Sequence, residues 1–135
     1  EMAASFAALP KLCPHFHLSL QSGCDLTLSR MNRHYTSQEY AEGVRLLRSV
    51  YDNPAITTDV IVGFPGETQE EFEESKDFLE KIAFYEVHVF KYSIRKGTAA
   101  AKLPGQLTDN QKSQRSDILL QITRKQAHQY RKLYW

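Results

Sequence analysis

Apolar and polar residues form blocks along the chain that predict strands, each followed by a helix. Residues 15–22 alternate strictly between polar and apolar, as a strand with two unlike faces does. Residues 57–63 are β-branched and largely apolar, which is typical of a strand buried on both faces. Residues 86–92 alternate again and predict a third strand.

The helices that follow these strands have recognisable starts. We expect long helices over 38–51, 68–82 and 109–133, and a short helix over 25–30 that Asp25 caps. A threonine with a Glu or Gln three residues later has the spacing of a capping box, in which side chain and backbone satisfy each other's hydrogen bonds. Three such pairs precede the long helices: Thr36 with Glu39, Thr68 with Glu71, and Thr108 with Gln111.

The order of these elements predicts the fold class. Strands that alternate with helices form parallel sheets with right-handed crossovers, so we expect an α/β fold of three parallel βα units. A closed eight-unit barrel needs about 250 residues, which a chain of 135 residues cannot supply. The pattern therefore predicts half of a barrel or a small open sheet.

Composition excludes several classes of protein. With 41% hydrophobic and 24% charged residues, the chain is neither a disordered tail nor a membrane protein. No apolar run approaches the roughly 20 residues of a membrane helix, and the first residues lack the pattern of a signal peptide. We therefore expect a cytoplasmic chain. The formal net charge of +1 gives no argument for nucleic acid as a partner.

Charge is nevertheless segregated along the chain. Residues 67–86 carry eight acidic side chains against two lysines, a net charge of −6, which we interpret as a solvated helix face. Residues 112–135 carry six basic side chains against Asp117, a net charge of +5. With Tyr130, Tyr134 and Trp135 interleaved, this last helix predicts either a contact with RNA or packing on a neighbouring domain.

Metal and phosphate sites find little support. Cys13, His15, His17 and Cys24 match no familiar ligand spacing, and two cysteines are too few for a four-cysteine zinc site. We interpret the two histidines as strand residues and expect no metal ligand in this chain. The glycines at 63 and 66 are too closely spaced for a phosphate-binding loop, and the Lys-Ser/Thr ending is missing.

The ends of the predicted strands are the best candidates for a site. Sites in parallel α/β folds form at the C-terminal ends of strands, which indicates residues 21–23, 63–67 and 92–97. Polar and aromatic side chains share one face of the first and third strands, and such a lining of the barrel interior suits a bound ligand. These side chains are His15, His17, Ser19, Gln21, His88, Phe90 and Tyr92.

Three stretches together resemble one family. They read HFHLSLQSGC followed by MNRHY (15–24 and 31–35), TDVIVGFPGET (58–68) and HVFKYSIRKGTAA (88–100). They look like the radical S-adenosylmethionine methylthiotransferases that modify tRNA. Within that group, the stretches are most similar to the branch that acts on N6-threonylcarbamoyladenosine beside the anticodon.

This resemblance implies a fold and a chemistry. Residues 1–107 would be the second half of a partial (βα)6 radical SAM barrel, which is TIM-like, and 108–135 a helix leading toward an RNA-binding module outside this chain. The cofactors would be S-adenosylmethionine and a [4Fe-4S] cluster. Reductive cleavage of S-adenosylmethionine would give a 5′-deoxyadenosyl radical, which activates an adenosine carbon for sulfur insertion. The family holds its cluster with a CxxxCxxC motif, which this sequence lacks. We therefore expect the isolated chain to be inactive and the cluster ligands to lie in an N-terminal half outside it.

The resemblance also implies a set of cofactor-binding residues. Arg33 would grip the methionine carboxylate, and Gln21 and Asp59 the ribose hydroxyls. The adenine would lie in an apolar slot beside the third strand. The full set is Gln21, Ser22, Arg33, Asp59, Ile61, Val62, Gly63, Phe90 and Tyr92.

Simpler alternatives stay open at this point. Arg33 can pair with a surface acid, and Asp59 can cap a turn. The chain can belong to another radical SAM methylthiotransferase, one acting on isopentenyladenosine in tRNA or on a ribosomal protein. It can also be a non-catalytic RNA-binding module that uses its basic last helix.

Overall fold

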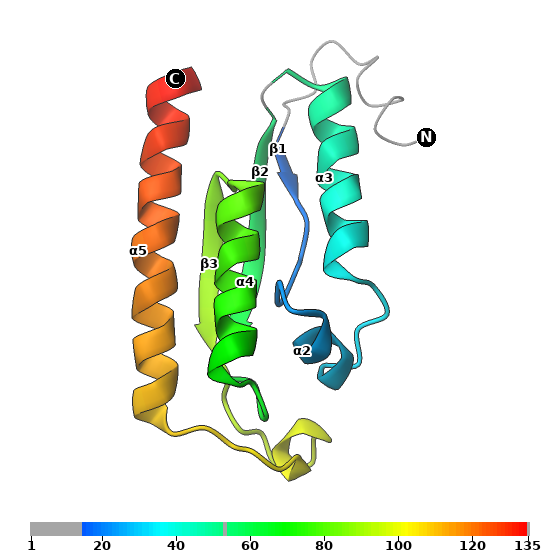
Figure 1. Ribbon diagram of the computed structural model, residues 1–135, viewed down its shortest axis with the longest axis vertical. Helices are drawn as coiled ribbons and strands as arrows, with labels where there is room; N and C mark the ends of the chain where they lie inside the picture. The colour runs from blue at the N-terminus through cyan, green and yellow to red at the C-terminus, as the bar shows by residue number, and fades with distance from the viewer. Residues whose placement is uncertain (1–14, 53, 135) are drawn as a thin grey trace.

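Three parallel strands form one sheet in the order β1–β2–β3, with β2 in the middle (Figure 1). The computed structural model describes residues 15–52 and 54–134. The strands are β1 (His15–His17), β2 (Ala55–Val62) and β3 (Glu86–Lys91). Both pairings are parallel, which confirms the α/β fold of consecutive βα units.

Helices follow each strand close to the predicted positions. They are α2 (Asp25–Arg30), α3 (Ser37–Val50), α4 (Gln69–Ile82), the 3₁₀ turn η1 (Ala100–Lys102) and α5 (Asp109–Tyr134). All three capping boxes are formed, because each threonine hydroxyl accepts from the backbone N–H three residues later and the Glu or Gln side chain accepts in return.

The cap predicted for α2 is wrong in one detail. Asp25 is the first residue of the helix, while the preceding Cys24 takes the N-cap position without a side-chain hydrogen bond. The Asp25 carboxylate instead accepts from the backbone N–H of Ser37 at 2.7 Å. Asp25 thus ties the start of α3 to α2, because the first backbone N–H groups of a helix have no partner within it.

The first strand is interrupted, which corrects the prediction of a continuous strand over 15–22. His17 is paired with Thr57, but Gln21 forms its bridge with Val60, so the first strand contains one extra residue between the two pairings. This is a β-bulge, and Gln21 takes up the strain with a φ of 73°.

A threonine side chain satisfies the backbone inside this bulge. The Thr58 hydroxyl donates to the carbonyl of Leu18 and accepts from the N–H of Leu20, with a donor–acceptor distance of 2.9 Å in the second bond. Thr58 is fully buried, and its hydroxyl supplies a hydrogen-bond partner to both backbone groups. The backbone of the bulge is therefore stabilised by hydrogen bonds to Thr58. The extra residue shifts the register of the first strand by one position between His17 and Gln21.

The hydrophobic core lies between one face of the sheet and the helices. It consists of Leu20, Val44, Leu47, Ile56, Val60, Val62, Phe72, Leu79, Ile82, Phe84, Val87 and Leu119. The opposite face of β2 is covered only in its first half: Thr57 is buried, whereas Asp59 and Ile61 are half-exposed. The prediction that this strand is buried on both faces therefore holds for its beginning and is wrong for its end.

The last helix, α5, lies along the sheet beside β3 and α4 (Figure 1). Leu119 is fully buried in the core, and the Gln126 side-chain amide donates to the carbonyl of Leu79 at 3.0 Å. The described part of α5 thus covers the sheet as the helix of the third βα unit. No helix within 15–52 and 54–134 is long and apolar enough to cross a membrane.

We expect Leu119→Ala to destabilise the chain by about 2–5 kcal/mol, because it leaves a cavity between α5 and the sheet. Urea unfolding followed by circular dichroism measures this loss. The neighbouring Ile118, which is 39% exposed, is the matched control and should cost about 1 kcal/mol or less when changed to Ala. Equal losses for the two variants would contradict the packing of α5 on the core.

Candidate functional site

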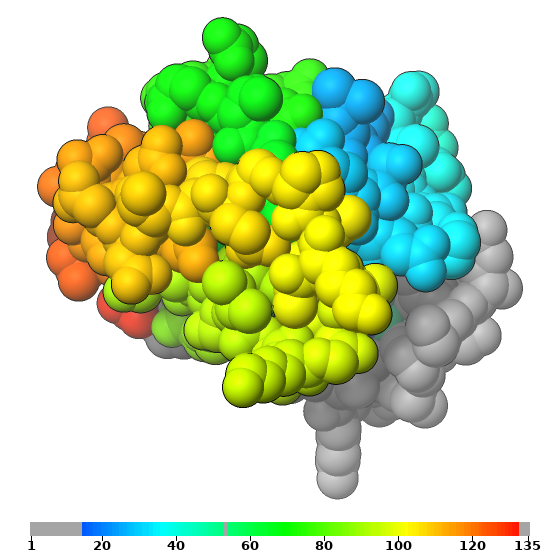
Figure 2. All heavy atoms as spheres, turned by 90° about the horizontal axis from the view of Figure 1, so that it is seen from below, coloured from blue at the N-terminus to red at the C-terminus, as the bar shows by residue number. Residues whose placement is uncertain are grey.

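A cleft of about 550 Å³ opens at the C-terminal ends of the strands. Its volume lies within the range of roughly 300–1,000 Å³ that is usual for small-molecule sites. Figure 2 views the molecule from this end, where the segment after β3 (yellow) lies between the start of α5 (orange) and the region of α2 (blue). The cleft is lined by Gln21, Asp59, Ile61, Phe90, Lys91, Tyr92, Ser93, Arg95, Thr98 and Ala100.

Five of the nine predicted site residues meet in this cleft: Gln21, Asp59, Ile61, Phe90 and Tyr92. They come from all three strand segments, and together they combine two polar side chains with an apolar and aromatic wall. The Phe90 ring is 53% exposed there, so its face is available to a ligand. The Tyr92 hydroxyl is buried and has no hydrogen-bond partner in the described part of the chain.

The structure places three other predicted residues away from the cleft lining. Ser22 is fully buried, and its hydroxyl accepts from the backbone N–H of Cys24 at 3.1 Å. Val62 belongs to the core beneath the helices. Gly63 is buried in the loop that follows β2.

Arg33 also lies outside the lining. Its side chain is exposed, and none of the ion pairs formed among residues 15–52 and 54–134 includes it. Two residues later, the Tyr35 hydroxyl donates to the carbonyl of Leu20 at 2.6 Å. This bond fixes the segment that carries Arg33 next to the chain that leads into Gln21.

The loop after β2 requires glycine at its start. Gly63 has a φ of +76°, and a Cβ there would lie 2.4 Å from Cγ of Lys112 on α5. The Gly63 N–H donates to a carboxylate oxygen of Glu67 at 2.9 Å, which closes the loop on itself. The close approach of α5 and the turn of the backbone therefore both depend on the missing side chain.

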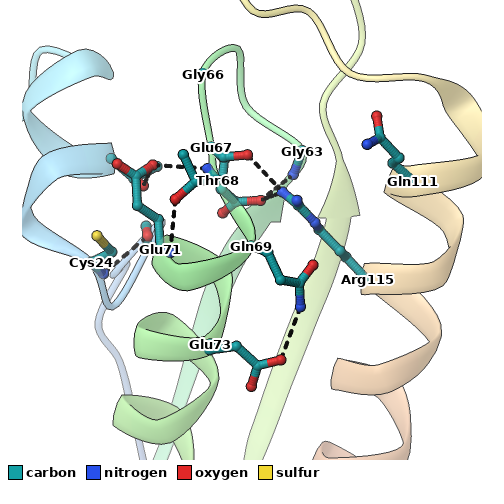
Figure 3. Close-up of polar contacts among 12 residues, drawn as sticks. Cys24, Gly63, Gly66, Glu67, Thr68, Gln69, Glu71, Glu73, Gln111 and Arg115 are labelled. Carbon is teal, nitrogen blue, oxygen red and sulfur yellow. Dashed lines mark hydrogen bonds and ion pairs between the residues drawn. The ribbon is translucent and has the colours of Figure 1, made fainter.

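A buried ion pair joins this loop to α5 (Figure 3). Arg115 donates to the Glu67 carboxylate at 2.7 Å and to its backbone carbonyl at 3.0 Å. The two side chains are only 8% and 1% exposed. Burial raises the pKa of the Glu67 carboxyl, while the Gly63 N–H and Arg115 act in the opposite direction.

A second pair holds the other side of the loop. Arg30 of α2 pairs with Glu71 of α4 and donates to the backbone carbonyl of Gly66 at 3.0 Å. Glu67 and Glu71 are both buried. The interpretation of the acidic helix start as a solvated face is therefore wrong for these two residues, which pair with the buried Arg115 and the partly exposed Arg30.

Asp59 and His17 form a polar group on the face of the sheet opposite the helices. The His17 imidazole lies 2.8 Å from the Thr57 hydroxyl and 3.1 Å from the Asp59 carboxylate. Asp59 lies inside β2, so it does not cap a turn as the simpler interpretation had it. His17 has the bonded strand position expected of it.

The described residues offer no metal centre. Burial raises the pKa of the Cys24 thiol, which favours its protonated form rather than the thiolate that binds metals. No group of three His, Cys, Asp or Glu side chains within 15–52 and 54–134 is placed to hold a metal ion. Cys13 lies outside the described residues.

Sequence reasoning missed two parts of this site. Lys91, Ser93, Arg95, Thr98 and Ala100 line the cleft but were not in the predicted set of site residues. Of these, Ser93 and Arg95 fall in the predicted site region 92–97, whereas Lys91 ends β3 and Thr98 and Ala100 lie beyond that region. Lys112 and Arg115 of α5 contact the loop after β2. The sequence near the loop does not indicate these contacts, because Glu67 and Arg115 are 48 residues apart.

The fold agrees with a comparison to known families. Residues 1–79 match the Radical SAM superfamily, and the chain belongs to this superfamily. This membership confirms the recognition from sequence and implies S-adenosylmethionine and an iron–sulfur cluster as cofactors. Coproporphyrinogen III oxidase (HemN) from Escherichia coli shares the fold with a TM-score of 0.70 at 15% identity, over 84% of this chain and 27% of that one. The three parallel βα units are thus half of a TIM-like radical SAM barrel.

Curated relatives are tRNA-modifying enzymes. Threonylcarbamoyladenosine tRNA methylthiotransferase MtaB of Thermotoga maritima is 41% identical over 98% of this chain and 30% of its own length. The tRNA-2-methylthio-N(6)-dimethylallyladenosine synthase of Pelotomaculum thermopropionicum is 40% identical over 93% of this chain and 28% of its own. That of Syntrophus aciditrophicus is 47% identical over 87% and 26%. The chain therefore spans less than a third of these relatives.

The cleft residues fit one of the two implied cofactors. The adenosine part of S-adenosylmethionine needs an apolar wall and hydroxyl partners, which Ile61, Phe90 and Asp59 offer. The cluster needs three thiolates, and the chain has two cysteines without the CxxxCxxC spacing. The residues of this chain therefore do not fit the cluster.

Arg115→Met should lower the free energy of unfolding by about 3–5 kcal/mol, because it leaves the Glu67 carboxylate buried without its cation. The double variant Arg115→Met/Glu67→Gln should recover part of this loss. Urea unfolding measures both. Arg131→Met is the control, because its contact with Glu86 at 4.0 Å is exposed and should contribute about 1 kcal/mol or less. Equal losses at the two arginines would contradict the buried pair.

Proposed function

We propose that the cleft at the strand ends binds S-adenosylmethionine. The observation that carries this proposal is that Gln21, Asp59, Ile61, Phe90 and Tyr92 line one cleft, although they come from three separate strand segments. Asp59 and Gln21 would bond the ribose hydroxyls. The adenine would lie against Ile61 and Phe90, with Tyr92 at its edge. When bound next to a reduced cluster, S-adenosylmethionine supplies the radical chemistry of this superfamily.

Three residues at the ends of the strand segments would act on the cleft through the backbone. Val62 and Gly63 would shape the adenine slot through the backbone that ends β2. The Tyr92 N–H donates to the Val62 carbonyl at 2.9 Å, which joins the ends of β2 and β3, and the Gly63 N–H donates to Glu67. Ser22 would act through the turn that follows Gln21. Its hydroxyl bond to Cys24 keeps that turn closed.

Arg33 is proposed as the residue that binds the methionine carboxylate. Its side chain is exposed, and the Tyr35 hydroxyl anchors its segment on the Leu20 carbonyl, one residue before Gln21. A guanidinium on a long flexible stem can reach from there over the mouth of the cleft. Its planar fork would bind both carboxylate oxygens.

We propose further that the chain is part of a tRNA methylthiotransferase, with tRNA as its partner in the cytoplasm. The relatives support this class, and they include enzymes named for threonylcarbamoyladenosine and for dimethylallyladenosine at similar identity. The coverage of 98% by the threonylcarbamoyladenosine enzyme, together with the resemblance of the three sequence stretches to that branch, favours that nucleoside.

The division of labour within such an enzyme follows from the residues present. This chain would supply the cofactor cleft, and the three cluster thiolates would come from a segment outside it. On this proposal, residues 1–107 complete a barrel, and 108–135 lead to an RNA-binding module. The isolated chain would then bind S-adenosylmethionine without turnover.

The Arg33→Ala variant should weaken binding of S-adenosylmethionine roughly 10- to 100-fold, as expected for losing a charge-assisted hydrogen bond. Titration of the ¹⁵N-labelled chain, followed by amide shifts, measures the affinity and shows whether the cleft residues respond. Arg45→Ala, an exposed arginine on α3, is the matched control and should bind as the wild type does. An unchanged affinity in Arg33→Ala would remove Arg33 from the site.

A chimera tests the substrate. Replacing the matching segment of the Thermotoga maritima enzyme with this chain should preserve methylthiolation of threonylcarbamoyladenosine in tRNA, read by mass spectrometry of digested nucleosides. The same replacement in a dimethylallyladenosine synthase should lower the methylthiolation of dimethylallyladenosine, because this segment would carry contacts to the other nucleoside. Loss in the first chimera with full activity in the second would reverse the choice of nucleoside.

A further inference from the structure

The imidazole of His17 links two strands on the face of the sheet opposite the helices. His17 stands beside Thr57 in the parallel register of β1 and β2. Thr57 and Asp59 are two residues apart in β2, so their side chains share this face. One ring nitrogen of His17 lies 2.8 Å from the Thr57 hydroxyl, and the other lies 3.1 Å from the Asp59 carboxylate.

The chemistry of the three groups determines the direction of both hydrogen bonds. An ionised carboxylate only accepts, so Nε2 of His17 carries the hydrogen that is donated to Asp59. In the neutral ring Nδ1 is then an acceptor, and the Thr57 hydroxyl must donate to it. Thr57 is 3% exposed, so water competes little for this hydroxyl. The chain of bonds therefore runs from Thr57 through His17 to Asp59.

This chain of bonds restrains the carboxylate that lines the cleft. Oδ2 of Asp59 accepts from His17, and no other hydrogen bond to this carboxylate is formed within 15–52 and 54–134. The Asp59 side chain is 29% exposed, so its other oxygen can accept from a ligand hydroxyl. A carboxylate whose orientation is already fixed binds a ligand at a smaller entropic cost than a free one.

We propose that His17 is a positioning residue of the cofactor cleft, which holds Asp59 in the orientation that accepts a ribose hydroxyl of S-adenosylmethionine. Thr57 orients the imidazole in turn. This proposal rests on the proposed binding of S-adenosylmethionine. It assigns His17 a role other than that of a strand residue with satisfied hydrogen bonds.

The fold provides a matched control. His88 on β3 faces the same side of the sheet, opposite Asp59 in the register, and its ring centre lies 6.2 Å from that of His17. It forms no hydrogen bond to Asp59 in the described part of the chain. An effect of His17 that came only from its charge or its exposure would be shared by His88.

The first test needs no ligand. Ring ¹⁵N shifts in mildly alkaline solution, where imidazoles are ordinarily neutral, report which nitrogen carries the hydrogen. We expect one tautomer for His17, with the hydrogen on Nε2, and a mixture for His88. Thr57→Val should shift His17 toward a mixture. A mixture, or the opposite tautomer, for His17 in the wild type would overturn the proposal.

The second test measures binding of S-adenosylmethionine to the labelled chain. His17→Ala should weaken binding roughly tenfold, the effect of one hydrogen bond to a charged group, and His17→Gln should restore most of it by donating from its amide. His88→Ala should bind as the wild type does, because His88, although predicted on the ligand-facing side, does not line the cleft. Urea unfolding shows that each variant is folded. Unchanged affinity in His17→Ala, or an equal loss in His88→Ala, would overturn the positioning role alone. If S-adenosylmethionine causes no change in the amide shifts of the wild-type chain, the proposed function is refuted as well.

Discussion

The carboxylate of Glu67 is the point on which the end of the sheet depends. It accepts from the Gly63 N–H within its own loop and from Arg115 of α5, and it is almost completely buried. A buried charge of this kind is tolerable only when its partners stay in place, because removing it from water costs several kcal/mol. The turn after β2 and the docking of the last helix are therefore coupled. Neither can shift without exposing or orphaning a charge.

The same principle holds the loop from the other side. Arg30 of α2 pairs with Glu71 and also donates to the Gly66 carbonyl. Since α2 follows the first strand segment and α5 follows the third, two arginines connect the ends of all three strands through one loop. The two pairs therefore hold the loop after β2 rigidly, and four residues that line the cleft, Asp59, Ile61, Phe90 and Lys91, stand on β2 and β3. A ligand site benefits from such rigidity, since little order has to be created on binding.

Local patterns were sufficient for the elements and insufficient for the contacts between them. The three capping boxes predicted the helix starts because their hydrogen bonds span only three residues. The bulge before Gln21 was missed, since alternation continues through residues 15–22 while the stabilising hydroxyl belongs to Thr58, about 40 residues away. The acidic run after Gly66 was misjudged for the same reason. Glu67 and Glu71 are buried in ion pairs with arginines on α5 and α2. The sequence around the two glutamates does not indicate these distant partners.

The candidate site divides along the same line. Residues of one strand phase, such as Asp59 and Ile61, were placed correctly because side chains two apart share a face. Ser22 and Val62 follow Gln21 and Ile61 directly, and adjacent residues of a strand point to opposite faces, so both are buried away from the cleft. Polar groups on the exposed face are stable because they bond to one another: Thr57, His17 and Asp59 leave one carboxylate oxygen for a ligand. On this face the polar side chains are hydrogen-bonded to one another, and one oxygen of Asp59 still lacks a donor. Such a face is better suited to binding a ligand than to forming part of a hydrophobic core.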